Sequence, residues 1–356
     1  MTLFADRLRK LARVTLAAAL GAGLGLGLGA ERAAYAQANY EAMVAAAKRE
    51  GKVLAYGEII TPTWRAVKEG FEKKYPGITM EFVYLSGQPM MTRVLTEQDA
   101  GRHLNDVLVL DTLRLPVLRD KGYLAKYDSI EAANYDKIWH SDPPGYWINN
   151  HVYLGGIMYN TALVPADQAP KSFDDLLKPQ WKGKIALVSP VSNDLIFYMF
   201  AGFVRDWGEA KAFDFFAKLK AQEPLVFGPG GIRVSQGVST GEFPIGIGFI
   251  GHVYSVGAGP NGKMALVPTK PTYALSGPGV AVMAKAPNPN AARLLADYMN
   301  SREVQEEHIV TLGYRTSFRG VKANPTISDL EVVVAPTPEG EAKDKLQNRI
   351  REALGL

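Results

Sequence analysis

The sequence predicts an α/β protein of two lobes, each an open sheet with helices on its faces. Short runs of β-prone apolar residues alternate with amphipathic helical segments, which is the pattern of open α/β sheets. The chain has 356 residues, more than one hydrophobic core normally serves, so two lobes are expected. It contains no cysteine, and packing alone must therefore stabilise the fold.

Helix and strand signals follow one another through the first third of the chain. A helix over 40–50 is expected to end at Gly51, where glycine permits the turn that stops a helix. Next come a buried strand over 53–56, a helix over 64–75, a strand over 78–85, a helix over 90–100 and a buried strand over 106–111.

The segment 146–192 predicts a strand pair, a short helix and another buried strand. Val152–Tyr159 is apolar and β-rich, and Gly155-Gly156 allows a bend or a close backbone approach. Ser172 can cap a short helix that ends before Pro179. The strand Ile185–Val188 then leads into a helix over 194–204.

Three motifs in this segment carry a family resemblance: YNT at 159–161, PKSFDDL at 170–176 and WKGKI at 181–185. In this order they resemble the family 1 extracellular solute-binding proteins of ABC importers, in particular the ferric-iron and aminoethylphosphonate binders. The resemblance implies the type II periplasmic-binding-protein fold: two lobes, each an open mixed sheet flanked by helices, with the ligand cleft between them. It also implies a binding protein rather than an enzyme.

Residues 1–36 are expected to be a signal peptide, and the same resemblance implies that the rest of the chain divides into two discontinuous lobes. Lobe one is expected to hold residues 37–155 and 275–312, and lobe two residues 156–274 and 313–356. The crossings between the lobes would then fall near 156–159 and 272–277.

The amino terminus predicts secretion. Four basic residues within 7–13 precede an uncharged run to Ala30, and Ala34-Tyr35-Ala36 is a typical cleavage site. Without a cysteine after that site the mature chain cannot be a lipoprotein, which favours the periplasm. Removal of residues 1–36 lowers the net charge from +4 to about +1. The sequence has no stripe of basic residues that would indicate nucleic-acid binding. The expected partners are a small-molecule ligand and an ABC permease in the inner membrane; we expect a monomer without a cofactor.

The expected ligand-binding residues lie in loops after strands, because ligands of open α/β sheets bind beyond the carboxyl ends of the strands. Backbone amides and hydroxyl groups in such loops can hold an anion. Helix capping is the alternative role for each loop. Four such loops are selected, one after each of the expected strands 53–56, 78–85, 106–111 and 185–188. Their candidate residues are Tyr56, Gly57, Ser86, Gly87, Asp111, Thr112, Ser189, Ser192 and Asn193.

The second half of the chain adds five candidates. Arg233 follows the glycine-rich turn at 228–231 and could clamp a carboxylate or phosphonate, or be an ordinary surface arginine. His252 and Tyr254 follow the strand 243–248, and their polar rings could face the cleft. Ser276 and Gly277 lie at the expected return crossing.

The sequence offers little support for an enzyme. The string GIGFIG at 246–251 matches a dinucleotide-binding motif, but the next acid after Glu242 is Asp297, too distant to bind a ribose. There is no P-loop or nucleophile-elbow motif. The five histidines are scattered without metal-ligand spacing. A secreted hydrolase with a triad assembled from distant residues remains the enzyme alternative.

The ligand is expected to be a small organic anion: a phosphonate, phosphate ester or carboxylate. Ferric binders of this family hold the metal with tyrosinates, including an adjacent pair just after the strand that corresponds here to 245–248. This chain reads Phe249-Ile250-Gly251-His252 there, so the pair is missing. Ferric iron remains the alternative ligand, with Tyr254 and Tyr153 as its candidate ligating residues.

Overall fold

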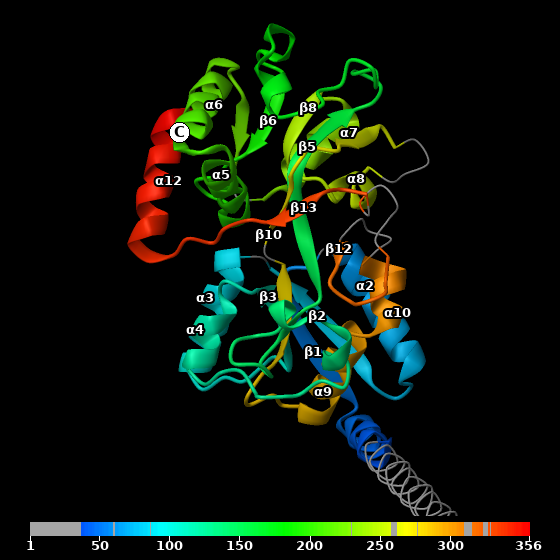
Figure 1. Ribbon diagram of the computed structural model, residues 1–356. Coiled ribbons are helices and arrows are strands. Elements are labelled where there is room, and N and C mark those ends of the chain that lie inside the picture. The colour runs from blue at the N-terminus through cyan, green and yellow to red at the C-terminus, as the bar shows by residue number, and fades with distance from the viewer. Residues whose placement is uncertain are drawn as a thin grey trace, which may run out of the picture.

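The protein has two sheets, each surrounded by helices, and the chain passes between them more than once (Figure 1). The computed structural model describes residues 37–59, 61–85, 87–228, 230–257, 262–275, 277–309, 315–322, 327 and 329–356. We call the elements of the five-stranded sheet the first lobe and those of the eight-stranded sheet the second lobe. The predicted two-lobed α/β class is confirmed.

The first lobe is built on a mixed sheet in the order β2-β1-β3-β11-β4. Strands β1, β2 and β3 are parallel, whereas β11 runs antiparallel to β3 and β4. The strands are β1 (Lys52–Gly57), β2 (Thr79–Tyr84), β3 (Val107–Asp111), β4 (Ile148–Asn149) and β11 (Pro278–Val282). The helices are the segment 37–50, α2 (Thr61–Lys74), α3 (Gly87–Asp99), α4 (Leu115–Asp120), α9 (Pro289–Met299) and α10 (Arg302–Val304).

The second lobe is built on a sheet in the order β13-β10-β5-β8-β6-β7, to which β12 and β9 add by pairing with β5. Its strands are β5 (His151–Asn160), β6 (Ile185–Val188), β7 (Leu225–Phe227), β8 (Ile245–Phe249), β9 (Met264–Val267), β10 (Thr272–Leu275), β12 (Arg315–Thr316) and β13 (Val332–Val334). Its helices are α5 (Asp194–Trp207), α6 (Glu209–Ala221), α7 (Ile232–Thr240), α8 (His252–Ser255) and α12 (Gly340–Leu354).

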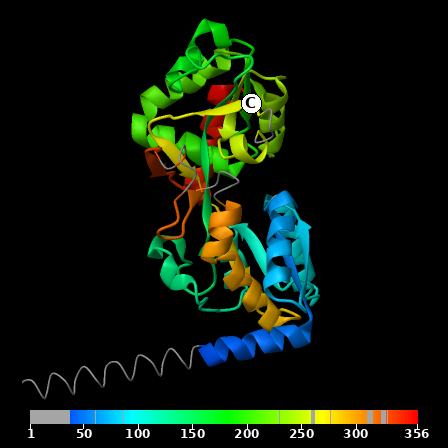
Figure 2. The ribbon, with the colours of Figure 1, turned by 90° about the vertical axis from the view of Figure 1, so that its right-hand side faces the viewer.

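The chain passes between the lobes at Asn150, between β4 and β5, near Gly277, between β10 and β11, and again between α10 of the first lobe and β12 of the second. The predicted crossing at 156–159 and the boundary at residue 155 instead fall inside β5, which belongs to the second sheet over its whole length. Gly155 and Gly156 do not mark a bend: a Cβ on Gly155 would lie 2.8 Å from Met199 Sδ, and one on Gly156 3.0 Å from Ile250 Cγ2. The two views of the ribbon show β5 extending from the junction deep into the second lobe (Figures 1 and 2).

The C-terminal helix α12 packs on the second lobe against α6 and α5. Lys343 Nζ lies 2.9 Å from Asp194 Oδ1, and Gln347 Nε2 donates to the carbonyl oxygens of Pro190 and Val191 at 3.3 and 3.2 Å. These contacts hold the loop that opens α5. The end of the chain therefore supports a loop between β6 and α5 that also borders the cleft.

Each lobe is stabilised by hydrophobic clusters between its sheet and the helices that pack on it. In the second lobe a large cluster joins β5, β6 and β8 to the apolar faces of α5 and α6, with aromatic residues such as Phe200 and Phe203 fully buried. In the first lobe, β1 and β3 separate two clusters, one beneath α2 and α9 and the other beneath α3 and α4. Among the described helices, none is long and apolar enough to cross a membrane.

Candidate functional site

A cavity of about 420 Å³ lies between the two lobes, at the ends of the strands that lead into loops. From the first lobe, Glu58 follows β1, Tyr84 ends β2 and Asp111 ends β3. The first turn of α3 and Arg114, at the start of α4, complete this wall. This is the location predicted for a ligand of open α/β sheets.

The second lobe contributes Tyr153 of β5, Phe249 of β8, His252 of α8, and the segments 192–195 and 230–232. These two segments open α5 and α7. Together with α3, three helices of 13, 14 and 9 residues begin at one cavity. The first amides of a helix lack intrahelical partners and carry partial positive charge, so this arrangement favours an anion.

Arg114 joins the walls of the cavity. Its Nη1 donates a short hydrogen bond to Asp111 Oδ2 in the first lobe, and its Nη2 lies 3.2 Å from Asp194 Oδ2 in the second lobe. Asp194 also forms an ion pair with Lys343 of α12. The guanidinium is thus shared between two carboxylates, and one of these bonds crosses from lobe to lobe.

Glu58 is the least compensated acid of the lining. Burial, and secondly the negative charge of Asp111, raise the pKa of Glu58 to about 8, while the backbone amides of Gly87 and Asp111 and the charge of Arg114 counter this shift. Its Oε2 accepts from Gly87 N over 3.4 Å. Its Oε1 is shielded from solvent and accepts no hydrogen bond from the described residues. Glu58 is therefore largely protonated at neutral pH.

His252 is neutral because burial lowers its pKa to about 4. Its Nδ1 lies 2.7 Å from Ser235 Oγ, and the Ser235 hydroxyl lies 3.1 Å from the Gly231 carbonyl oxygen. A carbonyl oxygen only accepts, so both contacts are hydrogen bonds when Ser235 donates to Gly231 and Nδ1 donates to Ser235. The other ring nitrogen, Nε2, is then an acceptor.

Five of the ligand-binding residues predicted from sequence line the cavity: Gly87, Asp111, Ser192, Asn193 and His252. Tyr153, one of the two residues predicted to ligate iron, also lines it. Asn193 is also the N-cap of α5, since its side chain accepts from Ile196 N over 3.0 Å. Capping and a place in the lining thus coexist at the same residue.

The other described candidates lie outside the lining. Tyr56 contacts Arg93 and Glu97 beneath α3, and Gly57 is packed against Trp64 and Val109. Thr112 N donates to Gly277 O over 3.2 Å at the junction of the lobes.

Three further candidates contact other residues of the second lobe and not the cavity. Ser189 Oγ accepts from Val191 N, and Tyr254 packs against the core. Arg233 is exposed and paired with Glu242 at 2.5 Å, so it is a surface ion pair in this structure rather than a clamp. Ser86 and Ser276 lie outside the described residues.

Sequence reasoning missed Glu58, Tyr84, Arg114 and Asp194 among the lining residues. Glu58 and Asp194 each lie next to a predicted loop residue in the sequence, and this adjacency could have identified them as lining residues. Arg114 lies three positions after Asp111, a spacing at which a basic residue can return to an acid across one turn.

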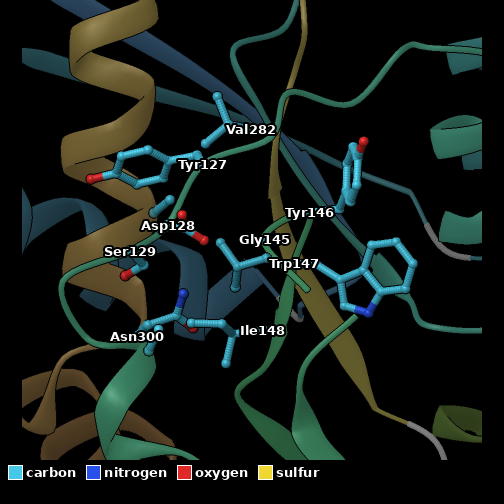
Figure 3. Close-up of a pocket in the computed structure, with 12 residues that line it drawn as sticks. Tyr127, Asp128, Ser129, Gly145, Tyr146, Trp147, Ile148, Val282 and Asn300 are labelled. Carbon is cyan, nitrogen blue, oxygen red and sulfur yellow. The ribbon is translucent and has the colours of Figure 1, made fainter. Parts of the chain in front are cut away.

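A second, much smaller cavity of about 20 Å³ lies in the first lobe, away from the cleft (Figure 3). Tyr127, Ser129, Gly145, Trp147 and Asn300 are among its lining residues. This is room for about one water molecule and not for an organic solute. Within the part of the chain that the structure describes, no three His, Asp or Glu side chains cluster as a metal site would require.

The fold is shared with proteins of known structure. The substrate-binding protein of an ABC transporter from Agrobacterium tumefaciens has a TM-score of 0.73 at 17% identity, covering 85% of this chain and 94% of that one. The periplasmic binding protein AfuA from Actinobacillus pleuropneumoniae, with fructose-6-phosphate bound, has a TM-score of 0.70 at 21% identity, covering 86% and 99%. Iron-bound HitA from Pseudomonas aeruginosa has a TM-score of 0.65 at 21% identity, covering 85% and 99%.

Sequence comparison identifies the family. An uncharacterised protein from Haemophilus influenzae is 34% identical over 171 residues, which are 46% of this chain and 47% of that protein, so the chain spans about half the length of this relative. The model of a family described as bacterial extracellular solute-binding protein matches residues 66–333. The chain therefore belongs to the bacterial extracellular solute-binding proteins.

Proposed function

We propose that the protein captures a small organic anion, such as a phosphate ester, phosphonate or carboxylate, in the periplasm and delivers it to an ABC permease. The observation that carries this proposal is the convergence of the α3, α5 and α7 N-termini on one cavity. First-turn amides of these helices can donate hydrogen bonds to an anion, although the Gly87 amide donates to Glu58 Oε2 and the Ile196 amide to Asn193 Oδ1 in this structure. AfuA, which shares the fold, is a periplasmic binding protein with a sugar phosphate bound.

The transport role rests on the family and on the amino terminus. Residues 1–36 would direct secretion and be removed, and a chain without cysteine has no site for a lipid anchor there. The mature monomer would close its lobes around the ligand, because only the closed cleft brings both walls to it. The permease would then recognise the closed form. Capture without chemical turnover is the expected activity.

A melting-shift screen of residues 37–356 tests the proposal. Phosphate esters, phosphonates and carboxylates are compared at equal concentration, and a cognate ligand should stabilise the folded state by about 2.7 kcal/mol at a hundredfold excess over Kd. Small-angle scattering with the best compound should show a smaller radius of gyration. If no anion raises the melting temperature, the anion assignment fails; if the best compound is chemically converted, the binding-only role fails.

Ferric iron is the second candidate, and one observation favours it. The phenols of Tyr84 and Tyr153 line the same cavity as the carboxyl groups of Glu58 and Asp111, and such hard oxygen donors suit Fe(III). Against it, Phe249 occupies the position of the expected tyrosine pair, and Arg114 places a cation in the wall. Ferric citrate should leave the protein colourless. A visible charge-transfer band that appears with ferric citrate and is lost in Tyr153→Phe would identify iron, and not an organic anion, as the ligand.

A further inference from the structure

Large side chains with apolar surface from both lobes are exposed in the cavity. Tyr84 ends β2 in the first lobe and is 44% exposed, and Ile232 begins α7 in the second lobe and is 38% exposed. Apolar surface gains free energy when it is removed from water. A ligand that covers both side chains is therefore favoured over one that leaves them in water.

The wall of the second lobe presents a row of rings. The ring centroids of Tyr153 and Phe249 are 5.6 Å apart, and those of Phe249 and His252 are also 5.6 Å apart. The Phe249 ring lies against Gly231 at the start of α7, where a Cβ would be 2.3 Å from Phe249 Cδ2. The three rings are uncharged, since His252 is neutral, and they lie beside a helix N-terminus. Such a surface favours contact with a ring of the ligand.

Three polar side chains of the lining are already committed to partners within the protein. Arg114 donates to both Asp111 and Asp194. Asn193 Oδ1 accepts from Ile196 N as the cap of α5. A ligand body with several hydroxyl groups would have to compete with these bonds or leave some of its own unmade, which is costly in a closed cleft. An apolar ring leaves the bonds in place.

The charges of the lining balance one another. Among the described residues of the lining, Arg114 is the only lysine or arginine, and it is shared by Asp111 and Asp194. Asp194 is also paired with Lys343, so two carboxylates face two cations. Glu58 is largely protonated at neutral pH. The helix N-termini add partial positive charge, about half an elementary charge each. One negative charge on the ligand suits this cavity, whereas a second would meet no unpaired cation among these residues.

We propose that the ligand is a monocarboxylate with an apolar ring, whose single negative charge lies at the helix N-termini and whose ring lies between Tyr84 and Ile232. This inference rests on the proposed function and narrows it from organic anions in general to ring-bearing monocarboxylates. The cavity of about 420 Å³ has room for one ring or a fused pair.

Calorimetry on the mature chain tests the ring. Phenylacetate, cyclohexylacetate and 1-naphthylacetate are compared with gluconate, a monocarboxylate with a hydroxylated body and no ring. At least one ring acid should bind about tenfold or more tighter than gluconate. Tyr84→Ser and Ile232→Ser should each shrink this preference, and because both side chains are exposed, the melting temperature without ligand should be kept. Ile138→Ser, at a side chain that is 73% exposed outside the lining, is the matched control and should leave the preference unchanged.

A second comparison tests the number of charges. The best ring acid is compared with the derivative that has another carboxylate on its α-carbon, and with the monomethyl ester of that derivative; for phenylacetate these are phenylmalonate and monomethyl phenylmalonate. The ester, of nearly the same shape but with one charge, should bind about tenfold tighter than the dicarboxylate.

Asp194→Asn should reverse this order of charges. It removes one acid of the lining and leaves Arg114 and Lys343 in place, so the ratio of the two affinities should move toward the dicarboxylate by about tenfold. Asp214→Asn is the matched control, because Asp214 pairs with Lys218 on the surface of α6, outside the lining. It should leave the ratio unchanged.

The outcomes separate this inference from the proposed function. Gluconate binding as tightly as every ring acid, or the dicarboxylate binding more tightly than its monomethyl ester, overturns the ring-bearing monocarboxylate. The anion proposal then stands on any other compound of the melting-shift screen that binds. If the ring acids fail to bind and the whole anion screen also fails, both fall.

Discussion

Arg114 of the first lobe donates a hydrogen bond from Nη2 to Asp194 Oδ2 of the second lobe over 3.2 Å. The same guanidinium neutralises Asp111, whose side chain is only 3% exposed, whereas Asp194 is 28% exposed and has Lys343 as a second partner. The two carboxylates therefore depend on Arg114 to very different degrees. This asymmetry makes the interlobe contact and the stability of the first lobe separable by mutation.

The first prediction concerns that asymmetry. Arg114→Met should lower the free energy of unfolding by about 2–4 kcal/mol, because it leaves Asp111 buried beside Glu58 without a counter-charge. Asp194→Ala removes only a partly exposed pair and should cost less than about 1 kcal/mol. It should nevertheless weaken closure, seen as a larger radius of gyration at saturating ligand than in the wild type. Urea denaturation and small-angle scattering measure the two effects.

Arg233→Met is the matched control, since Arg233 is an exposed arginine paired with exposed Glu242. It should leave stability and ligand affinity nearly unchanged. Equal losses of stability in Arg114→Met and Asp194→Ala would contradict the unequal dependence of the two carboxylates on Arg114.

The fold class and the cavity's position were predictable because buried strands and the loops after them have strong local signals. Val107–Asp111 and Ile185–Val188 are fully buried runs, and each leads into a segment that lies at or next to the cleft. The first crossing was misplaced for a local reason. Gly155 and Gly156 have the same sequence signal whether they permit a bend or, as here, the close packing of Met199 and Ile250.

The individual lining residues were harder to predict because the alternation of side chains between the two faces of a sheet does not continue beyond the end of a strand. Tyr56 turns to the core beneath α3, and Glu58, two residues later and already beyond the strand, lines the cavity. The place of Arg114 depends on how the chain turns after β3, and its spacing of three residues from Asp111 was the available sequence signal. Arg233 resembled an anion clamp, but its partner Glu242 lies nine residues further on and only the fold brings them together.

The second prediction separates the helix cap from the anion site. Asn193→Asp keeps an N-cap side chain at α5, so the free energy of unfolding should change by less than about 1 kcal/mol. The added carboxylate faces the proposed anion site and should weaken binding of an organic anion at least tenfold. Calorimetry with the best ligand of the screen measures this.

Asn193→Ser is the control, because serine caps a helix without adding charge. It should bind the anion more tightly than Asn193→Asp does. Tighter binding of ferric iron by Asn193→Asp, with no loss of anion affinity, would contradict an anion site at α5.

The third prediction concerns pH. The pKa of Glu58 is about 8 in the folded protein against an ordinary value of 4.5, so ionisation of Glu58 opposes folding. This penalty is absent below the ordinary pKa, grows as the pH rises and is complete above the folded pKa. The free energy of unfolding should therefore fall between pH 6.5 and 9, and Glu58→Gln should remove about 2 kcal/mol of that fall. Urea denaturation at both pH values measures it.

Asp297 provides the control for this pH window. Burial raises its pKa to about 6, and its carboxylate accepts from Tyr127 Oη at 2.7 Å and Ser129 Oγ at 2.6 Å. It is already mostly ionised at pH 6.5, so Asp297→Asn should change the overall stability but hardly the difference between pH 6.5 and 9. A Glu58→Gln variant with the full wild-type pH dependence would show that Glu58 ionises normally.

The last prediction concerns the return crossing at Gly277. A Cβ at this position would lie 1.9 Å from the carbonyl oxygen of His151, so Gly277→Ala forces the backbones of the two crossings apart. We expect a loss of about 1–3 kcal/mol in the free energy of unfolding. Ligand binding should also weaken, because Gly277 O accepts from Thr112 N at the junction of the lobes, next to Asp111 of the cavity lining. Gly228→Ala, where the added methyl meets nothing within 4 Å, is the control. Thermal melting with and without ligand compares them, and equal melting temperatures would show that the crossings can separate freely.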